Sequence, residues 1–211
     1  MSTRLSRWGH SCVRLDRGPD RLVIDPGGFS DVGGALDGVG AVLVTHEHVD
    51  HLAPEPVIAS GAQVWAPQAA LDLLAAAGAD PDRLHAVSAG DSVEAGGFQV
   101  VVLGEWHALI HADVPRVPNV GYLVAGVLHP GDAYVDPAGA QVDVLLTPVG
   151  GPWLKIGEVV DYVRSVRPTR LVVIHDAQLS PAGVGLASTL LGRLGGAGEP
   201  VQLAAGEGLD L

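Results

Sequence analysis

Short apolar runs, each bounded by Gly, Pro or Asp, dominate the first part of the chain. Runs of this kind, rich in Val, Leu and Ile and flanked by turn-forming residues, are typical of β-strands. We therefore predict strands over residues 12–15, 22–24, 41–45, 98–103 and 122–127. Near the end of the chain, residues 171–174 and 201–204 predict two further strands.

Other segments have the spacing of α-helices. Residues 67–77 begin with Pro, carry Ala and Leu at helical intervals, and are followed by Gly78 as a stop. In residues 156–166 apolar side chains recur every three to four positions, and Pro168 follows. A third helix is expected over residues 181–194. Because strands come first and mix with helices later, the order predicts sheets with helices on their outer faces.

Composition narrows the class of protein. The chain has 211 residues, of which 47% are hydrophobic, so we expect one domain over residues 1–211. A net charge of −12, with only 12 Lys and Arg, argues against nucleic acid as a partner. No apolar stretch has the length of a signal peptide or membrane span, so we expect a cytoplasmic protein without a membrane partner. The single cysteine, Cys12, excludes an internal disulfide, and the oligomeric state stays open.

Four potential metal ligands follow the predicted strand 41–45 closely: His46, His48, Asp50 and His51. They cannot all face one ion comfortably, but a turn can direct His46 and His48 to one ion and Asp50 and His51 to another. Imidazole and carboxylate ligands suit zinc, and also manganese or iron. Pairs of such ions, about 3.5–4 Å apart, are a recurrent device of hydrolytic enzymes.

Further ligands must come from elsewhere in the chain. Three candidates each lie beyond an apolar run: His107, Asp132 and His175. His111 is an alternative to His107, because a helical turn would bring both residues to the same side. We favour His107, which comes sooner after the strand. For Asp132 the alternative is a Gly-Asp turn in which the carboxylate caps its own backbone.

Taken in order, the His-x-His-x-Asp-His motif, a distant His, a Gly-Asp pair and a final His resemble the metallo-β-lactamase superfamily. Within it, the chain looks closest to the small lactonase-like branch that includes ascorbate-6-phosphate lactonase. Weaker matches at residues 8–11, 22–26 and 148–151 agree in order. The resemblance covers nearly the whole chain and implies an α/β fold, an αββα sandwich of two mixed β-sheets flanked by helices.

The resemblance also implies roles for the candidate residues. A first metal would be held by His46, His48 and His107, a second by Asp50, His51 and His175, and Asp132 would bridge the two. Asp25 is expected to orient a ligand imidazole as a supporting acceptor. The remaining candidates for binding substrate or supporting the ligands are His10, His111 and His129.

These residues indicate a binuclear metal-dependent hydrolase with a small-molecule substrate. Two divalent cations, zinc first with manganese or iron as alternatives, would activate a shared water as the nucleophile. Asp50 and Asp132 are the expected catalytic residues, and the bond cleaved is expected in a small lactone, ester or phosphoester. The alternative is a metal-stabilised small-molecule binding or sensor module without turnover.

Overall fold

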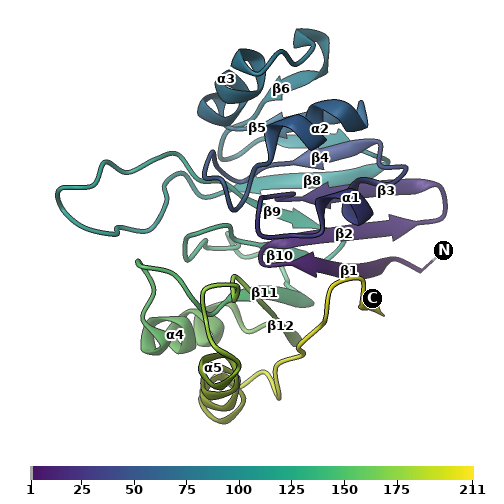
Figure 1. Ribbon diagram of the computed structural model, residues 1–211. Coiled ribbons are helices and arrows are strands. Elements are labelled where there is room, and N and C mark those ends of the chain that lie inside the picture. Colours follow the sequence, from purple (N-terminus) through teal and green to yellow (C-terminus); the bar gives the residue numbers. More distant parts are fainter. Residues whose placement is uncertain (1) are drawn as a thin grey trace.

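Two β-sheets face each other, and helices cover their outer faces, in the computed structural model, which describes residues 2–211 (Figure 1). The first sheet runs in the order β13-β1-β2-β3-β4-β5-β6 and the second in the order β12-β11-β10-β9-β8-β7. The first consists of β1 (Arg4–Gly9), β2 (Cys12–Arg17), β3 (Asp20–Ile24), β4 (Ala41–Leu43), β5 (Gln63–Ala66), β6 (Leu84–Ala86) and β13 (Gly208–Asp210). The second consists of β7 (Ser92–Ala95), β8 (Phe98–Leu103), β9 (Gly121–Val124), β10 (Val127–His129), β11 (Val144–Pro148) and β12 (Arg170–Ile174).

Each sheet combines antiparallel hairpins with parallel crossovers. Strands β1 to β3 pair antiparallel, and β3 to β6 pair parallel. In the second sheet β7 to β10 pair antiparallel, and β10 to β12 pair parallel. The helices are α1 (Val32–Leu36), α2 (Pro54–Ser60), α3 (Gln68–Ala76), α4 (Ile156–Val166) and α5 (Pro181–Leu194). In open α/β sheets ligands bind beyond the carboxyl ends of the strands, so these ends are where a site is expected.

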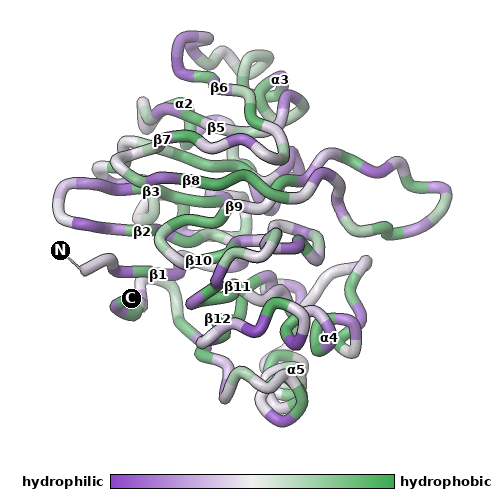
Figure 2. Tube along the Cα trace, turned by 180° about the vertical axis from the view of Figure 1, so that it is seen from behind, coloured by the Kyte–Doolittle hydropathy of each residue, from purple (hydrophilic) through white to green (hydrophobic). Residues whose placement is uncertain are grey.

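Apolar side chains fill the space between the sheets and the space beneath the helices. Leu43 and Phe98, one from each sheet, are both buried in the layer between them. Helix α4 buries Val159 and Val163 against the second sheet, and α3 buries Leu71 against the first. Figure 2 shows the hydrophobic residues concentrated along the central strands. The expected αββα sandwich is therefore confirmed.

Most of the predicted elements are present, and two are wrong. The run 122–127 is not one strand, because Ala125 and Gly126 have φ of +50° and +79° and form the turn between β9 and β10. Residues 201–204 are not a strand either: Val201 makes only an isolated bridge to Val172. The last strand is β13, which pairs with β1.

None of the helices within residues 2–211 combines the length and the hydropathy that crossing a membrane requires.

Candidate metal centre

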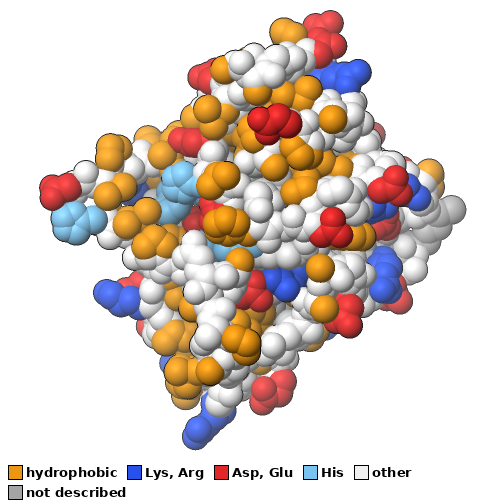
Figure 3. Space-filling view, in the orientation of Figure 1, with side chains coloured by type: hydrophobic (Ala, Val, Ile, Leu, Met, Phe, Trp, Pro, Cys, Tyr) orange, Lys and Arg blue, Asp and Glu red, His pale blue; other side chains and the backbone are white. Residues whose placement is uncertain are grey.

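The predicted site residues lie where strands of both sheets end. Residues 46–51 follow β4, His107 follows β8, Asp132 follows β10 and His175 follows β12. A long loop, residues 104–119, starts at the same place and projects from the molecule (Figure 1). Pale blue histidine side chains reach the surface at the foot of this loop (Figure 3).

The seven residues predicted to bind metal come together here, in groups whose donor atoms lie within 4.8 Å of one another. The groups are His46, His48 and His107; His10, Asp50, His51 and His175; and His46, His51 and Asp132. Asp132 connects them. Its Oδ1 is 3.1 Å from His51 Nε2, and its Oδ2 is 3.0 Å from His175 Nε2 and 3.4 Å from His107 Nε2.

Several buried polar atoms at this point have no hydrogen-bond partner among the described residues: His51 Nε2, His175 Nε2 and Asp132 Oδ1. Leaving such an atom unpaired costs about 1–3 kcal/mol. Imidazole nitrogens and a carboxylate oxygen that converge in this way fit divalent cations, which these donors bind at about 2.0–2.2 Å. The donor set suits zinc, manganese or iron.

Hydrogen bonds on the outer side of the rings indicate the tautomers of two candidate ligand histidines. His51 Nδ1 lies 2.6 Å from Asp25 Oδ2, and His107 Nδ1 lies 2.6 Å from the backbone oxygen of Ala108. Both partners accept, so each Nδ1 carries a proton, and in the neutral ring each Nε2 is the nitrogen that faces the centre with a lone pair. A metal-bound imidazole needs this arrangement.

The hydrogen bonds of His10 and His129 distinguish these two residues from the candidate ligands. His10 Nδ1 accepts from the backbone N–H of Ala177 at 3.2 Å, so its Nε2 carries the proton and donates to Asp50 Oδ2 at 3.2 Å. Burial lowers the pKa of His10, which keeps the ring neutral. His10 therefore supports Asp50 instead of offering a lone pair. His129 is fully buried, with both ring nitrogens bonded to backbone groups, so it is closed to substrate.

Asp25 lies behind the ligands and not among them. Its Oδ1 accepts from the backbone N–H of Thr45, and its Oδ2 accepts from the Thr45 hydroxyl, both at 2.7 Å. The same hydroxyl oxygen lies 3.0 Å from His46 Nδ1. One buried carboxylate thus orients His51 directly and His46 through Thr45.

Two supporting residues were not predicted from the sequence. Trp153 Nε1 donates to Asp132 Oδ2 at 2.8 Å. Buried Asn119 accepts from the backbone N–H of Asp132 at 2.9 Å and donates to the oxygen of Pro130 at 3.0 Å. Neither residue belongs to a local motif, and the only signal for Trp153 is its place just after residues 148–151.

The structure places His107, and not His111, beside His46 and His48. The side chain of His111 is 67% exposed, and its Nδ1 accepts from the backbone N–H of Asp113. Within residues 2–211 it joins none of the ligand groups. The loop is not helical, so the turn that would have brought His111 to the same side as His107 is not formed.

Burial and charged neighbours set the pKa values in the cluster. Burial lowers the pKa of His46 well below its usual value and also lowers the pKa of His48, so both rings are neutral at neutral pH. Burial raises the pKa of Asp132, but the neighbouring histidines, His51 first, outweigh it and hold that pKa well below its usual value. For His51, burial lowers the pKa, but the neighbouring carboxylates of Asp132 and Asp25 outweigh it and raise that pKa well above its usual value. A metal ion that binds His51 must therefore displace a proton from its ring.

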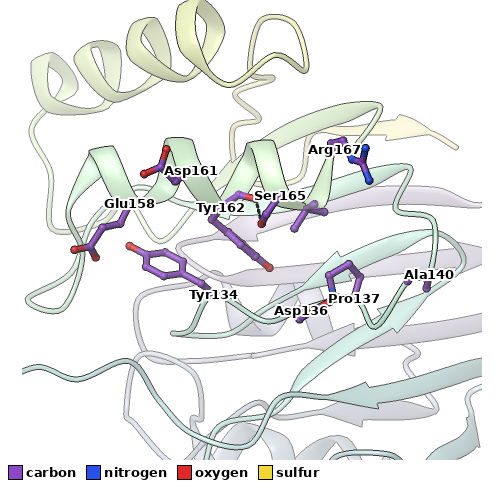
Figure 4. Close-up of a pocket in the computed structure, with 11 residues that line it drawn as sticks. Tyr134, Asp136, Pro137, Ala140, Glu158, Asp161, Tyr162, Ser165 and Arg167 are labelled. Atoms are coloured by element: carbon purple, nitrogen blue, oxygen red, sulfur yellow. Dashed lines mark hydrogen bonds between the residues drawn. The ribbon is translucent and has the colours of Figure 1, made fainter.

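A pocket of about 440 Å³ opens beside the centre, between the 104–119 loop and the start of α4. Trp153, which contacts Asp132, and Tyr134 form part of its wall. A cavity of about 610 Å³ lies farther along α4, beneath the side chains drawn in Figure 4. Tyr134 and Glu158 line both cavities, and of the two the smaller one also includes Trp153, which bonds to Asp132.

The fold and the clustered His and Asp side chains define a protein of the metallo-β-lactamase type. The chain belongs to the β-lactamase superfamily: the family described as "Beta-lactamase superfamily domain" matches residues 4–175. Protein Rv0786c of Mycobacterium tuberculosis is 40% identical over 195 residues, which cover 87% of this chain and 88% of that protein. A UPF0173 protein of Pyrococcus furiosus is 32% identical over 82% of this chain and 83% of its own length.

Some relatives carry a functional description. A protein of Mesorhizobium japonicum named UPF0173 metal-dependent hydrolase is 34% identical over 50% of this chain and 48% of its own length. Among solved structures, Igni18, a metallo hydrolase of Ignicoccus hospitalis, has a TM-score of 0.76 at 18% identity and matches 100% of this chain and 99% of its own. YhfI of Bacillus subtilis, a metallo-β-lactamase fold protein, has a TM-score of 0.75 at 14% identity over 100% of both chains. The chain thus shares its superfamily with proteins that are named metal-dependent hydrolases.

Proposed function

We propose that the chain is a binuclear metal-dependent hydrolase of a small lactone, ester or phosphoester. The observation that supports this most directly is the convergence of unpaired, buried imidazole and carboxylate atoms around Asp132. One ion would be held by His46, His48 and His107, and a second by Asp50, His51 and His175, with Asp132 shared by both. Zinc is the first expectation, and manganese and iron suit the same donors.

Divalent cations held by these residues would supply Lewis acidity and would lower the pKa of a bound water. The chain's own residues set the geometry for that chemistry. His10 Nε2 donates to Asp50 Oδ2 and so fixes the carboxylate that would orient the attacking water. Trp153 and Asn119 fix Asp132 from two directions, one through its side chain and one through its backbone.

The adjoining pocket supports a small-molecule substrate, because its volume of about 440 Å³ lies in the range of small-ligand sites. Its wall reaches the centre through Trp153, so a bound molecule lies next to the proposed ligands. The likeness to the lactonase-like branch makes a lactone the first substrate to try, with carboxylic and phosphoric esters beside it.

Elemental analysis of protein purified without chelator, combined with assays on lactone, carboxylic ester and phosphodiester substrates, tests the proposal. We expect about two ions per chain, and loss of both metal and turnover in His48→Ala and Asp132→Ala. His85→Ala is the matched control, because His85 stacks on Trp65 and takes no part in the ligand groups of residues 2–211. Two ions with no turnover of any substrate would favour a binding module, and absence of metal under every loading condition would defeat the proposal.

A further inference from the structure

Large hydrophobic side chains are exposed near the candidate centre. On the 104–119 loop, Leu109 is 57% exposed, Ile110 36% and Val114 42%. Val49, within the 46–51 motif, is 68% exposed, and Phe29 is 49% exposed, with its ring 5.4 Å from that of His10. Single exposed hydrophobic residues need no explanation, but several of them near one site indicate a binding surface. Orange side chains on the protruding loop in Figure 3 show where this group faces solvent.

The 440 Å³ pocket has an apolar wall. Its aliphatic residues are Ala108, Leu109, Ile110, Pro152 and Leu154, and its aromatic residues are Tyr134 and Trp153. Because Ala108 follows the predicted ligand His107 and Trp153 bonds to Asp132, this wall begins at the metal centre. A substrate whose reacting bond lies at the centre would therefore place its next group against these side chains.

The charges at the pocket cancel. Lys155, the single lysine of the chain, lies 3.2 Å from Glu158, and both line the pocket. Arg116, on the same loop, donates to the backbone oxygen of His107 and lies over the ring of Trp106. No unpaired cation among residues 2–211 lines the pocket, and the adjoining cavity adds two acidic residues, Asp136 and Asp161, and one basic residue, Arg167 (Figure 4). With a net charge of −12 on the chain, this surface disfavours an anionic group.

We propose that this pocket binds an uncharged acyl or aryl group, which the substrate carries next to the bond that is cleaved. The inference rests on the proposed hydrolase function for its chemistry, but the binding of an apolar group to the pocket stands apart from turnover. Leu109 and Ile110 provide the preference for an apolar group, because they are the exposed aliphatic residues nearest to His107 along the loop.

The first arm of the test measures kcat/KM for one alcohol esterified with acetate, butyrate, hexanoate and octanoate. Burial of each methylene contributes up to about a fourfold gain, so kcat/KM is expected to rise along the series in the native protein. In the double variant Leu109→Ser with Ile110→Ser we expect kcat/KM to be nearly the same for all four esters. Leu186→Ser is the matched control, because Leu186 is 63% exposed on α5 and lines neither pocket.

The second arm measures binding without turnover, by calorimetry with octanamide on the metal-loaded protein. We expect octanamide to bind native protein and Leu186→Ser alike, and to bind the double variant at least about tenfold more weakly.

The two arms separate the proposals. Octanamide binding that depends on Leu109 and Ile110 supports the pocket even if no ester is cleaved, and then only the hydrolase proposal fails. Acetate ester turnover without a chain-length effect, together with equal octanamide binding in native protein and the double variant, overturns the pocket and leaves the hydrolase standing.

Discussion

Backbone strain is concentrated at the residues of the centre. Among residues 2–211, His10, Asp25 and His175 are three of the six non-glycine residues with positive φ, at +41°, +53° and +56°. Such conformations cost on the order of 1–3 kcal/mol each and persist only where the surroundings fix them. Here the backbone N–H of His175 donates to the oxygen of His10 at 3.0 Å, so two strained residues hold each other. The strain sets the direction in which each of these side chains leaves its strand or turn.

Trp153 offers a direct test of how Asp132 is oriented. Trp153→Phe keeps an aromatic ring in the buried position but removes the N–H that donates to Asp132 Oδ2. Removal of such an outer hydrogen bond costs about 10–100-fold in metal affinity. We expect a loss of this size in a titration against a chelator, with no loss for Trp106→Phe, whose ring is 44% exposed and bonds no ligand. Equal affinities in the two variants would contradict the role given to Trp153.

The pH dependence of stability should report on Asp50. Burial raises the pKa of Asp50, but the hydrogen bond from His10 and the charge of His51 lower it to about 2, against 3.8 for a free side chain. A carboxyl group whose pKa is lower in the folded chain than in the unfolded chain stabilises the fold. This contribution is complete at pH values above the unfolded pKa and is lost as the pH falls from about 4 to about 2.

In protein stripped of metal by a chelator, Asp50→Asn should therefore unfold more easily than native protein at pH 5. The difference, about 1 kcal/mol, should shrink as the pH approaches 2. Urea unfolding at a series of pH values measures it, with exposed Asp113→Asn as the control. A difference that does not depend on pH would argue against the shifted pKa.

At the scale of elements, the sequence was sufficient where a signal is local. Strand β8 and helices α4 and α5 have the predicted bounds, because each has a long periodic pattern between clear stops. Strands β5, β6 and β7 are short and partly polar, so they carry little signal of their own. Strand β13 is defined by its pairing with β1 at the other end of the chain, which no local pattern reveals.

The candidate site also has some features that the sequence predicts and others that it does not. The ligand motif 46–51 and the later His and Asp residues could be predicted because each follows a strand in a recognisable order. The proton positions on His10 and His129 could not, because they depend on Ala177 and other backbone groups far away in sequence. The bond from Trp153 to Asp132 likewise arises only when loops of the folded chain meet.

Helix α5 contains a position where stability can be raised. Gly185 lies in its interior, and a Cβ added there would have no neighbour within 4 Å. Because glycine loses more backbone entropy than alanine on folding, Gly185→Ala should raise the free energy of unfolding by about 0.5–1 kcal/mol. Urea denaturation measures the change, and unchanged metal content and activity would show that the centre is untouched. A lower stability would mean that α5 packs differently from the structure.

At the scale of the whole molecule, the proposed ligands come from both sheets. Residues 46–51 follow a strand of the first sheet, whereas His107, Asp132 and His175 follow strands of the second. Ions shared by these residues would link the two halves of the sandwich across its edge. Metal binding would then contribute to the stability of the whole fold and not only to activity.

Metal removal should therefore lower the midpoint of thermal unfolding. Each ion present at 100 times its Kd stabilises the folded chain by about 2.7 kcal/mol. We expect chelation to lower Tm and added zinc or manganese to restore it in native protein, with no response to metal in Asp132→Ala. Unchanged Tm after verified removal of the metal would show that the ions do not link the sheets.

The 104–119 loop is fastened at both ends. At its base the backbone N–H of His107 donates to Val117 and that of Asn119 donates to Glu105, and Asn119 also holds Asp132. The residues between these anchors project away from the sandwich (Figure 1). Mutations, insertions or deletions in the projecting part can therefore accumulate without displacing the anchors. Mutations confined to this segment can therefore change which molecules such a protein binds, while the candidate metal centre at the base of the loop is conserved.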